Sequence, residues 1–325
     1  MSLKYLIFGG SGFVGTHLSN YLEDVGSSFL IADLIKPIKQ GLSFEVSDVR
    51  ENISLNIEKN PETIIINFAA IHITPGHKDE EYFETNIKGA ENICNFARKN
   101  DINTILFTSS ISPYGASEEV KKETTLPMPN TPYGISKLVA EEIHKRWQAE
   151  IPDKRKLIIL RPGVVFGQNE GGNFTRLYQA MSKGFFFYPG RKDTKKACIY
   201  VKDLITKMVE MVEKTKPGVH LYNMCYPEPY SLEEICETMA TIAQIKPPKF
   251  LIPAWFLKFV AFILFYVGRL VGKKIMGIHP DRINKLLIST NINGNKLLEN
   301  GYHLNYSLVN ALEDWYNECQ RKGLK

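Results

Sequence analysis

Two kinds of hydrophobic pattern alternate over the first 165 residues of the chain. Short runs of apolar, mostly β-branched residues predict buried strands at residues 4–8, 29–33, 63–67, 104–109 and 157–160. The segments between these runs have the length and spacing of helices, as at residues 12–25, 80–100 and 132–150. Strands that alternate with helices build a parallel sheet with helices on both faces. The pattern therefore predicts an α/β fold with a doubly wound parallel sheet.

The alternation weakens after Pro162, and the later segments are aromatic and irregular, as at residues 184–190. We expect a smaller, mainly helical C-terminal domain from about this point. A strand at residues 197–201 and a helix at residues 202–213 are expected to return to the first sheet. The predicted first domain comprises residues 1–165 with 197–223, and the second comprises residues 166–196 and 224–325.

Residues 250–271 form the most apolar segment of the chain. Lys258 and Arg269 interrupt the segment, and Pro253 and Gly268 break its helical pattern, so we do not expect it to span a membrane. As a helix it would be apolar nearly all round, which fits either a buried helix over the active site or a helix at a membrane interface. We favour packing against the protein and keep contact with a membrane surface as the alternative.

Composition and charge narrow the choice of partner. The chain has 325 residues, 44% of them hydrophobic and 23% charged, which is typical of a globular protein of about two domains. Its net charge of +5 is spread without any run of like charges, which argues against nucleic acid and suits a small anionic ligand. Five cysteines without a C-x-x-C pair indicate free thiols and no metal site. The first apolar run is too short for a signal peptide, so we expect a cytoplasmic protein.

A glycine-rich loop follows the first predicted strand and opens the first predicted helix. Gly9 allows a tight turn, Gly12 allows a pyrophosphate to approach the backbone, and Gly15 allows close helix packing. Asp33 ends the second strand, where a carboxylate accepts hydrogen bonds from a ribose and repels a 2′-phosphate. A structural turn and a solvated Asp are the alternative. We expect a Rossmann-type domain that binds NAD rather than NADP.

Tyr133 and Lys137 stand four residues apart, on one face of a predicted helix. A free tyrosine has a pKa of about 10, so it needs a nearby cation to act as a base. Lys137 and the nicotinamide would both supply positive charge. Hydroxyl groups at residues 108–110 end a predicted strand, at the edge of an α/β sheet where ligands bind.

Together these motifs resemble an extended short-chain dehydrogenase/reductase of the NAD-dependent epimerase/dehydratase family. The resemblance covers nearly the whole chain, and the order and spacing of the motifs make it specific. It is carried by Gly9, Gly12 and Gly15, Asp33, residues 67–70, Asn86, residues 108–115, Tyr133, Lys137, residues 161–167 and residues 199–203.

The resemblance implies a role for each catalytic residue. Ser110 would hydrogen-bond the reacting oxygen, Tyr133 would be the acid/base, and Lys137 would lower the pKa of Tyr133 and hold the nicotinamide ribose. Asn86 is expected to tie the loop after the fourth strand to its helix. Other residues expected at the cofactor are Phe13, Val14, Asp48, Val49, Phe68, Ala69, Ala70, Thr108, Arg161 and Pro162. Asp48 would reach the adenine edge, although a helix cap before Arg50 explains it equally well.

Substrate contacts are expected from both halves of the chain. His72 takes the place of a lysine that is common in related epimerases, and a histidine on a surface loop explains this position equally well. Ser112 and Asn173 are further candidates for sugar contacts. Lys196, with Lys195 beside it, and Arg282 are candidates to hold a diphosphate, and solvated surface lysines are the alternative for the first pair. The aromatic run at residues 185–188 fits packing better than stacking on a ligand.

The resemblance implies hydride transfer between NAD and a nucleotide-linked sugar in a homodimer. Dehydration is not expected, because Ile111 and Ser112 stand where sugar dehydratases of the family carry an Asp-Glu pair. We expect an epimerase. The alternatives are a nucleotide-sugar 4-ketoreductase, a dehydrogenase of a sterol-like or other hydrophobic alcohol, and a non-catalytic NAD sensor. The sensor ranks last because Ser110, Tyr133 and Lys137 are all present.

Overall fold

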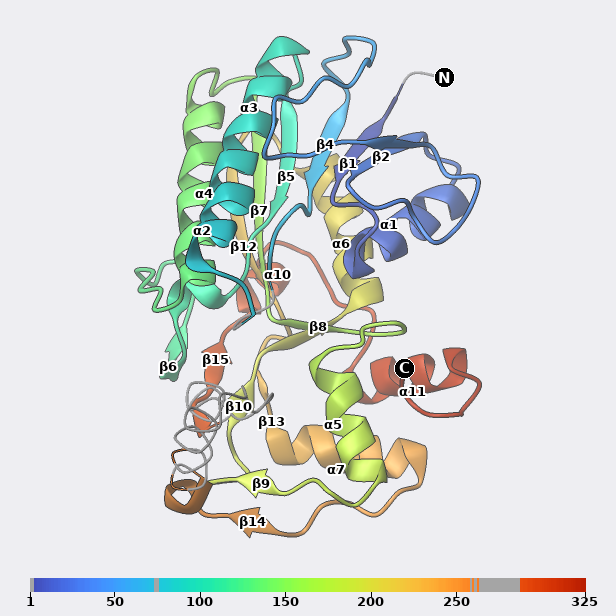
Figure 1. Cartoon of the computed structure of the whole chain (residues 1–325), viewed down its shortest axis with the longest axis vertical. Coiled ribbons are helices and arrows are strands. Elements are labelled where there is room, and N and C mark those ends of the chain that lie inside the picture. Colours follow the sequence, from blue (N-terminus) through green and yellow to red (C-terminus); the bar gives the residue numbers. More distant parts are fainter. Residues whose placement is uncertain (1–2, 73–75, 258, 260–261, 263–286) are drawn as a thin grey trace, which may run out of the picture.

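A computed structural model describes residues 3–72, 76–257, 259, 262 and 287–325. Its centre is a seven-stranded sheet in the order β12-β7-β5-β4-β1-β2-β3, with every neighbouring pair parallel (Figure 1). The strands are β1 Tyr5–Phe8, β2 Phe29–Asp33, β3 Phe44–Val46, β4 Ile64–Asn67, β5 Thr104–Thr108, β7 Lys156–Pro162 and β12 Gly218–Met224. The predicted doubly wound α/β fold is confirmed.

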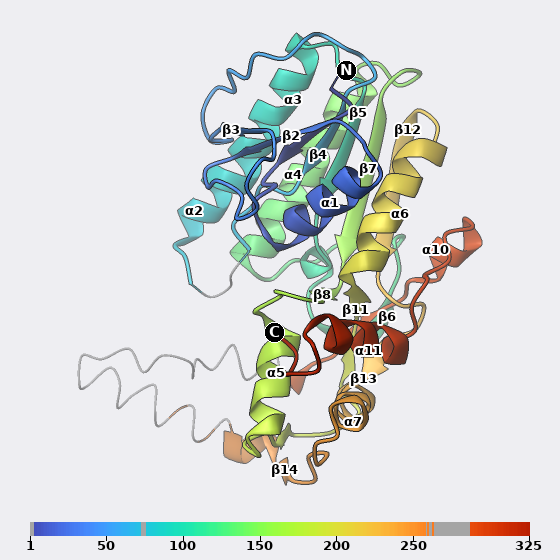
Figure 2. The same cartoon turned by 90° about the vertical axis from the view of Figure 1, so that its right-hand side faces the viewer.

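Helices cover both faces of this sheet. On one face lie α1 (Phe13–Asp24) and α6 (Val201–Lys214), and on the other lie α2 (Asp79–Phe83), α3 (Gly89–Lys99) and α4 (Pro132–Ala149) (Figures 1 and 2). Side chains of β1 alternate between the two cores, with Tyr5 and Ile7 in the first and Leu6 and Phe8 in the second. The helix expected at residues 80–100 is divided by a π-helical turn at Glu84–Lys88.

The second region combines helices with small sheets. Its helices are α5 Asn173–Ser182, α7 Leu232–Ala243, α10 Asn295–Glu299 and α11 Leu308–Glu318. A four-stranded sheet has the order β13 Tyr230–Ser231, β10 Lys195–Lys196, β15 Thr290–Ile292 and β6 Ser117–Lys121. Two further pairs are β8 Val164–Phe166 with β11 Cys198–Tyr200, and β9 Tyr188–Pro189 with β14 Leu251–Ile252.

The strand expected to return to the main sheet at residues 197–201 does not join it. Instead β11 pairs with β8 in a sheet of its own, and the return is made by α6 and β12, which pairs with β7. The physical cause is that β7 has no free edge for this strand, because β5 and β12 pair with its two sides. The chain then turns at Gly163, which lies so close to Ala197 that a Cβ would be 2.6 Å from its carbonyl oxygen. The division of the chain into two domains at residue 165 stays a prediction.

Within the described ranges, no helix is both long and apolar enough to cross a membrane. Most of the apolar segment at residues 250–271 lies outside these ranges, as does Arg282.

Candidate active site

The glycine loop lies between β1 and α1 at the carboxyl edge of the main sheet. Gly9 has a φ of 74°, and a Cβ there would be 2.6 Å from the backbone nitrogen of Ala69. At Gly15 a Cβ would be 2.5 Å from the carbonyl oxygen of Gly10, so only glycine lets α1 pack this closely. At Gly12 a Cβ would meet only the carbonyl oxygen of Gly9, at 3.6 Å, so the space above the helix start is open. This geometry exposes helix N–H groups to an anion.

Asp33 lies at the end of β2, beside this loop. One carboxylate oxygen accepts a hydrogen bond from the Ser11 backbone N–H at 2.9 Å, and the other accepts one from the Ile35 N–H at 3.2 Å. Two backbone donors therefore fix the carboxylate next to the glycine turn. An open helix start with a carboxylate beside it fits the pyrophosphate and ribose of a dinucleotide.

Ser110, Tyr133 and Lys137 come together at the end of β5. Ser110 lies close enough to Tyr133 to favour its ionised form, but burial dominates and raises the pKa of Tyr133 to about 12. The Ser110 Oγ donates to Ser112 Oγ at 3.1 Å. Lys137 lies one helical turn further along α4, where its Nζ donates to the Thr108 carbonyl oxygen at 2.9 Å. Burial lowers the pKa of Lys137 to about 7, although the charge of Glu141 opposes this shift. The three predicted catalytic residues therefore share one site, with their tasks still to be tested.

The strand end that carries this cluster also holds an unsatisfied hydroxyl. Thr108 Oγ1 is buried and has no hydrogen-bond partner in the part of the chain that the structure describes. A buried polar atom without a partner costs free energy unless a ligand or water satisfies it. Together with the Lys137 amine, this hydroxyl fits the ribose of a bound cofactor.

Behind the cluster lies a buried network that the sequence did not predict. Ser109 Oγ donates to Glu141 Oε1 at 2.6 Å, and Arg161 donates to both oxygens of the same carboxylate. The guanidinium also lies over the Tyr114 ring, with 4.6 Å to its centroid. Arg161 was predicted at the cofactor, and this contact stays a prediction. A sequence signal for Glu141 existed, because it follows Lys137 by one helical turn.

Asn86 ties the loop after β4 to the helices, as predicted. Its amide exchanges hydrogen bonds with the backbone of Ile71 at 2.9 and 3.2 Å and donates to Ser136 Oγ at 2.8 Å. His72 follows Ile71 in this loop. Desolvation, followed by the positive charge of Lys137, holds the pKa of His72 below its ordinary value. A substrate contact by His72 stays a prediction.

Asp48, predicted at the adenine edge, and several other residues predicted at the cofactor make contacts within the protein. Asp48 accepts a hydrogen bond from the Arg50 backbone and forms an ion pair with its guanidinium at 2.6 Å, and the pKa of Asp48 is lowered by this partner. Val49 is buried, and a Cβ at Gly89 would lie 2.9 Å from its Cγ2. Phe13, Val14 and Phe68 are half-buried against one core, and Ala69 against the other. Their cofactor contacts stay predictions, as do those of Ala70 and Pro162.

On the substrate side, Lys196 lies in β10 with its Nζ donating to the Ile288 carbonyl oxygen at 3.0 Å. Burial lowers its pKa to about 8, while the charge of Glu118 opposes this shift. Arg191, which the sequence did not single out, forms an ion pair with Glu118 and donates to Ser289 Oγ at 2.8 Å. Two cations therefore lie in this part of the fold, both influenced by Glu118.

The remaining substrate candidates are spread along the chain. The Ser112 N–H donates to Ser110 Oγ at 3.1 Å, so Ser112 adjoins the catalytic cluster. Asn173 is exposed at the first residue of α5, and Arg282 lies outside the described residues. In the aromatic run, Tyr188 is buried as expected, but Phe185 and Phe187 are exposed. The prediction of packing is therefore wrong for these two phenylalanines.

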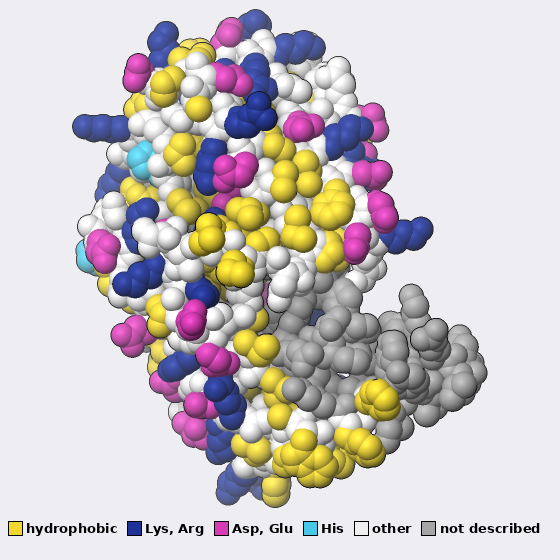
Figure 3. Space-filling view, turned by 90° about the vertical axis from the view of Figure 1, so that its left-hand side faces the viewer, with side chains coloured by type: hydrophobic (Ala, Val, Ile, Leu, Met, Phe, Trp, Pro, Cys, Tyr) yellow, Lys and Arg dark blue, Asp and Glu magenta, His cyan; other side chains and the backbone are white. Residues whose placement is uncertain are grey.

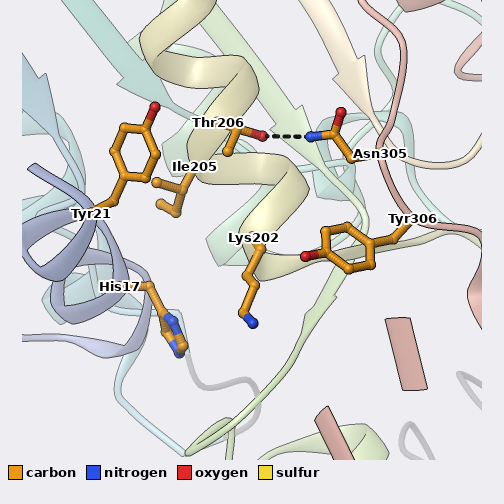
Figure 4. A pocket seen from close by; sticks show the side chains of 7 residues that line it. All are labelled: His17, Tyr21, Lys202, Ile205, Thr206, Asn305 and Tyr306. Carbon is orange, nitrogen blue, oxygen red and sulfur yellow. Dashed lines mark hydrogen bonds between the residues drawn. The ribbon is translucent and has the colours of Figure 1, made fainter. Parts of the chain in front are cut away.

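A cavity of about 540 Å³ lies away from this cluster, where α1 and α6 meet the segment at Asn305 and Tyr306 (Figure 4). Four of its polar side chains, those of His17, Lys202, Thr206 and Asn305, already have partners. Lys202 forms ion pairs with Asp314 at 2.6 Å and Glu318 at 2.9 Å, and Asn305 donates to Thr206. We therefore do not assign a ligand to this cavity.

A sequence model of the NAD dependent epimerase/dehydratase family matches residues 5–225. The chain belongs to this family. Its cofactor is accordingly NAD, as the glycine loop and Asp33 predicted, and the expected enzyme class is confirmed.

Relatives within the family are similar over most of their length. The N-acetyl-alpha-D-glucosaminyl-diphospho-ditrans,octacis-undecaprenol 4-epimerase of Escherichia coli O157:H7 is 26% identical, covering 96% of this chain and 94% of its own. The UDP-glucose 4-epimerase of Vibrio cholerae is 27% identical, covering 84% of each chain. A solved structure of MoeE5 in complex with UDP-glucose and NAD has a TM-score of 0.74 at 20% identity, covering 98% of this chain and 99% of that one, which confirms the fold.

Proposed function

We propose that this protein is an NAD-dependent 4-epimerase of a nucleotide-linked sugar. The proposal rests above all on Ser110 and Tyr133, which lie close together beside the end of β5, with the Lys137 amine donating to the Thr108 carbonyl oxygen of the same strand. These groups suffice to remove the proton of a sugar hydroxyl while the carbon that bears this hydroxyl loses a hydride. Family membership supports the proposal, and both relatives described above are named as 4-epimerases.

Each side chain of this cluster has its own task. The oxygen of Tyr133 accepts the proton of the sugar hydroxyl, and Ser110 Oγ donates a hydrogen bond to the same sugar oxygen. Bound NAD supplies the hydride acceptor and, once reduced, the hydride donor. Tyr133 then returns the proton when the ketone is reduced on its other face. Substrate and product are isomers, so no net oxidation occurs.

Positive charge near Tyr133 decides whether this phenol can act as a base. Because burial raises the pKa of Tyr133 to about 12, the phenol needs a cation to lose its proton near neutral pH. Lys137 supplies that charge, but burial lowers its own pKa to about 7. The carboxylate of Glu141 opposes the loss of this charge. The Glu141 carboxylate therefore favours the protonated form of Lys137.

Epimerisation and ketoreduction are separated by one experiment. Purified enzyme is incubated with UDP-glucose or UDP-N-acetylglucosamine without added cofactor, and the sugars are resolved by chromatography. Formation of the C4 epimer with cofactor that copurifies supports the proposal, because the same hydride returns to the sugar. A second incubation supplies a UDP-4-keto sugar, because UDP-glucose and UDP-N-acetylglucosamine carry no ketone for NADH to reduce. Reduction of this ketone in proportion to added NADH, with no epimer formed from the two alcohols, establishes a 4-ketoreductase instead.

A second candidate substrate is a sugar whose diphosphate is carried by a polyprenol. The relative from Escherichia coli O157:H7, which spans nearly the whole chain, is named for such a substrate. A diphosphate is common to both substrates, so Lys196 would serve either one. Parallel assays with UDP-N-acetylglucosamine and N-acetylglucosaminyl-diphospho-undecaprenol in detergent decide between them. Turnover of the lipid alone would overturn the nucleotide-sugar proposal.

A homodimer and a cytoplasmic location are further proposals that follow from the family resemblance. Light scattering of the purified protein tests the first, and fractionation of cells that produce it tests the second.

A further inference from the structure

A group of exposed aromatic side chains lies at the far end of the second region. The side chains of Phe185, Phe250 and Trp255 are 76%, 71% and 69% exposed, and Phe187 and Phe256 are also exposed. We call these five residues the aromatic edge. Single exposed apolar residues are normal, but a contiguous group of large aromatic side chains marks an interaction surface.

Strand pairing brings two members of the aromatic edge together, Phe187 and Phe250. Residues Tyr188 and Pro189 of β9 pair with Leu251 and Ile252 of β14, which brings the chain before β9 beside the chain before β14. The ring centroids of Phe187 and Phe250 are consequently 6.3 Å apart. Trp255 and Phe256 follow β14 closely in the chain, and their ring centroids are 5.8 Å apart. Figure 3 shows hydrophobic side chains gathered at this end of the molecule.

The charges within the same segments have one sign. Lys183, Lys246 and Lys249 are exposed, whereas residues 182–190 and 244–257 contain no aspartate or glutamate. Lysines that flank aromatic side chains suit a surface that is apolar within and negatively charged outside. Lysines near an anionic membrane are attracted to its negative surface charge. Tryptophan and phenylalanine rings insert at the level of the headgroups.

We propose that the aromatic edge docks on the surface of an anionic lipid bilayer. Membrane docking goes beyond the proposed epimerisation and does not require a lipid substrate.

Trp255 offers a direct measurement, because the chain has three tryptophans and Trp147 and Trp315 are both 0% exposed. Full-length protein is mixed with vesicles of phosphatidylcholine and phosphatidylglycerol, or of phosphatidylcholine alone. We expect co-sedimentation with the anionic vesicles and a blue shift of tryptophan fluorescence. Brominated lipid should quench this emission, since only Trp255 is placed to reach the acyl chains. High salt should weaken the binding.

The double substitution W255S/F256S should raise the apparent Kd for anionic vesicles about tenfold, which corresponds to about 1.4 kcal/mol. K246E/K249E should weaken binding to anionic vesicles. The matched control is Leu126→Ser, which removes a side chain that is 78% exposed in the loop before α4. Turnover of a soluble UDP-sugar by these variants reports separately on the proposed epimerase.

Two results would overturn docking. One is wild-type protein that stays in the supernatant with anionic vesicles at low salt. The other is a wild-type dimer that W255S/F256S converts to monomer in light scattering, because the edge would then be a contact between two copies of the chain.

Discussion

The Glu141 carboxylate and the Arg161 guanidinium form a buried, bidentate ion pair. Arg161 Nε donates to Glu141 Oε1 at 2.9 Å, and Arg161 Nη2 donates to Oε2 at 2.6 Å. Their side chains are 0% and 2% exposed. Since Glu141 belongs to α4 and Arg161 to β7, the pair fixes the catalytic helix to the sheet. Such a pair is costly to break, because removing one partner leaves an uncompensated buried charge.

Glu141→Gln is therefore expected to lower the free energy of unfolding by about 3–5 kcal/mol in urea titrations. Glu142→Gln is the matched control on the same helix, since it removes only an exposed pair with Lys145 and should cost about 1 kcal/mol or less. Replacing both buried partners by apolar residues, as in E141L/R161M, should restore part of the loss. Equal effects of the first two variants would contradict this account.

Tyr133→Phe should keep NAD affinity and lower turnover by about 100-fold or more, the usual scale of acid/base catalysis. The variant retains the ring and removes only the hydroxyl that Ser110 contacts. Steady-state kinetics give the turnover, and fluorescence titration gives NAD affinity. Near-normal turnover would remove Tyr133 from the mechanism.

Asp33→Ser should narrow the preference for NAD over NADP by about tenfold or more, because a carboxylate repels the 2′-phosphate of NADP. The substitution also loses the bonds that Asp33 accepts from Ser11 and Ile35, so NAD itself should bind more weakly. Isothermal titration with both cofactors measures the ratio. Wild-type protein that binds NADP as tightly as NAD would show that Asp33 does not face the ribose.

Lys196→Ala should raise the KM for a diphosphate-linked sugar roughly 10-fold and leave kcat unchanged, because the contact lies away from the reacting carbon. Lys195→Ala is the control, since its neighbouring side chain pairs with Glu234 at 3.7 Å. The pKa of Lys196 is lowered to about 8 by burial, so the wild-type KM should also rise above pH 8 as the amine loses its charge. A KM that changes neither with pH nor with the Lys196→Ala substitution would show that the diphosphate binds elsewhere.

His144 should make the protein sensitive to acid. Its Nδ1 lies 2.7 Å from the Ala140 carbonyl oxygen, which can only accept, so the neutral ring carries its proton there. Burial lowers the pKa of His144 to about 4, below its usual 6.5. As pH falls, His144 therefore takes up a proton in the unfolded state before it does so in the folded state. Its contribution to the free energy of unfolding is fully present above pH 6.5 and is lost towards pH 4, by about 3 kcal/mol at most.

His144→Gln should remove this part of the acid sensitivity, measured as the free energy of unfolding at pH 7 and pH 4.5. The control is His303→Gln, which changes an exposed histidine. A wild-type protein and H144Q variant with parallel pH profiles would show that His144 is not buried in its neutral form.

The sequence by itself determined the main sheet, the glycine loop and the Tyr133–Lys137 pair. All three are local signals. Alternating apolar runs and helical segments follow from the periods of strand and helix, and chain order then leaves few topologies for a parallel sheet. A tyrosine and a lysine four residues apart share a helix face whatever the rest of the chain does.

Only the tertiary structure decided which distant residues meet. Glu141 and Arg161 come from a helix and a strand whose contact depends on the packing of α4 against β7. Arg191 meets Glu118 across 73 positions of sequence, and β11 pairs with β8 although its pattern suits the main sheet equally well. The same holds for Phe187 and Tyr188, adjacent aromatic residues of which one is exposed and the other buried. Burial and pairing between distant segments depend on free energies summed over the whole fold, and no local pattern encodes them.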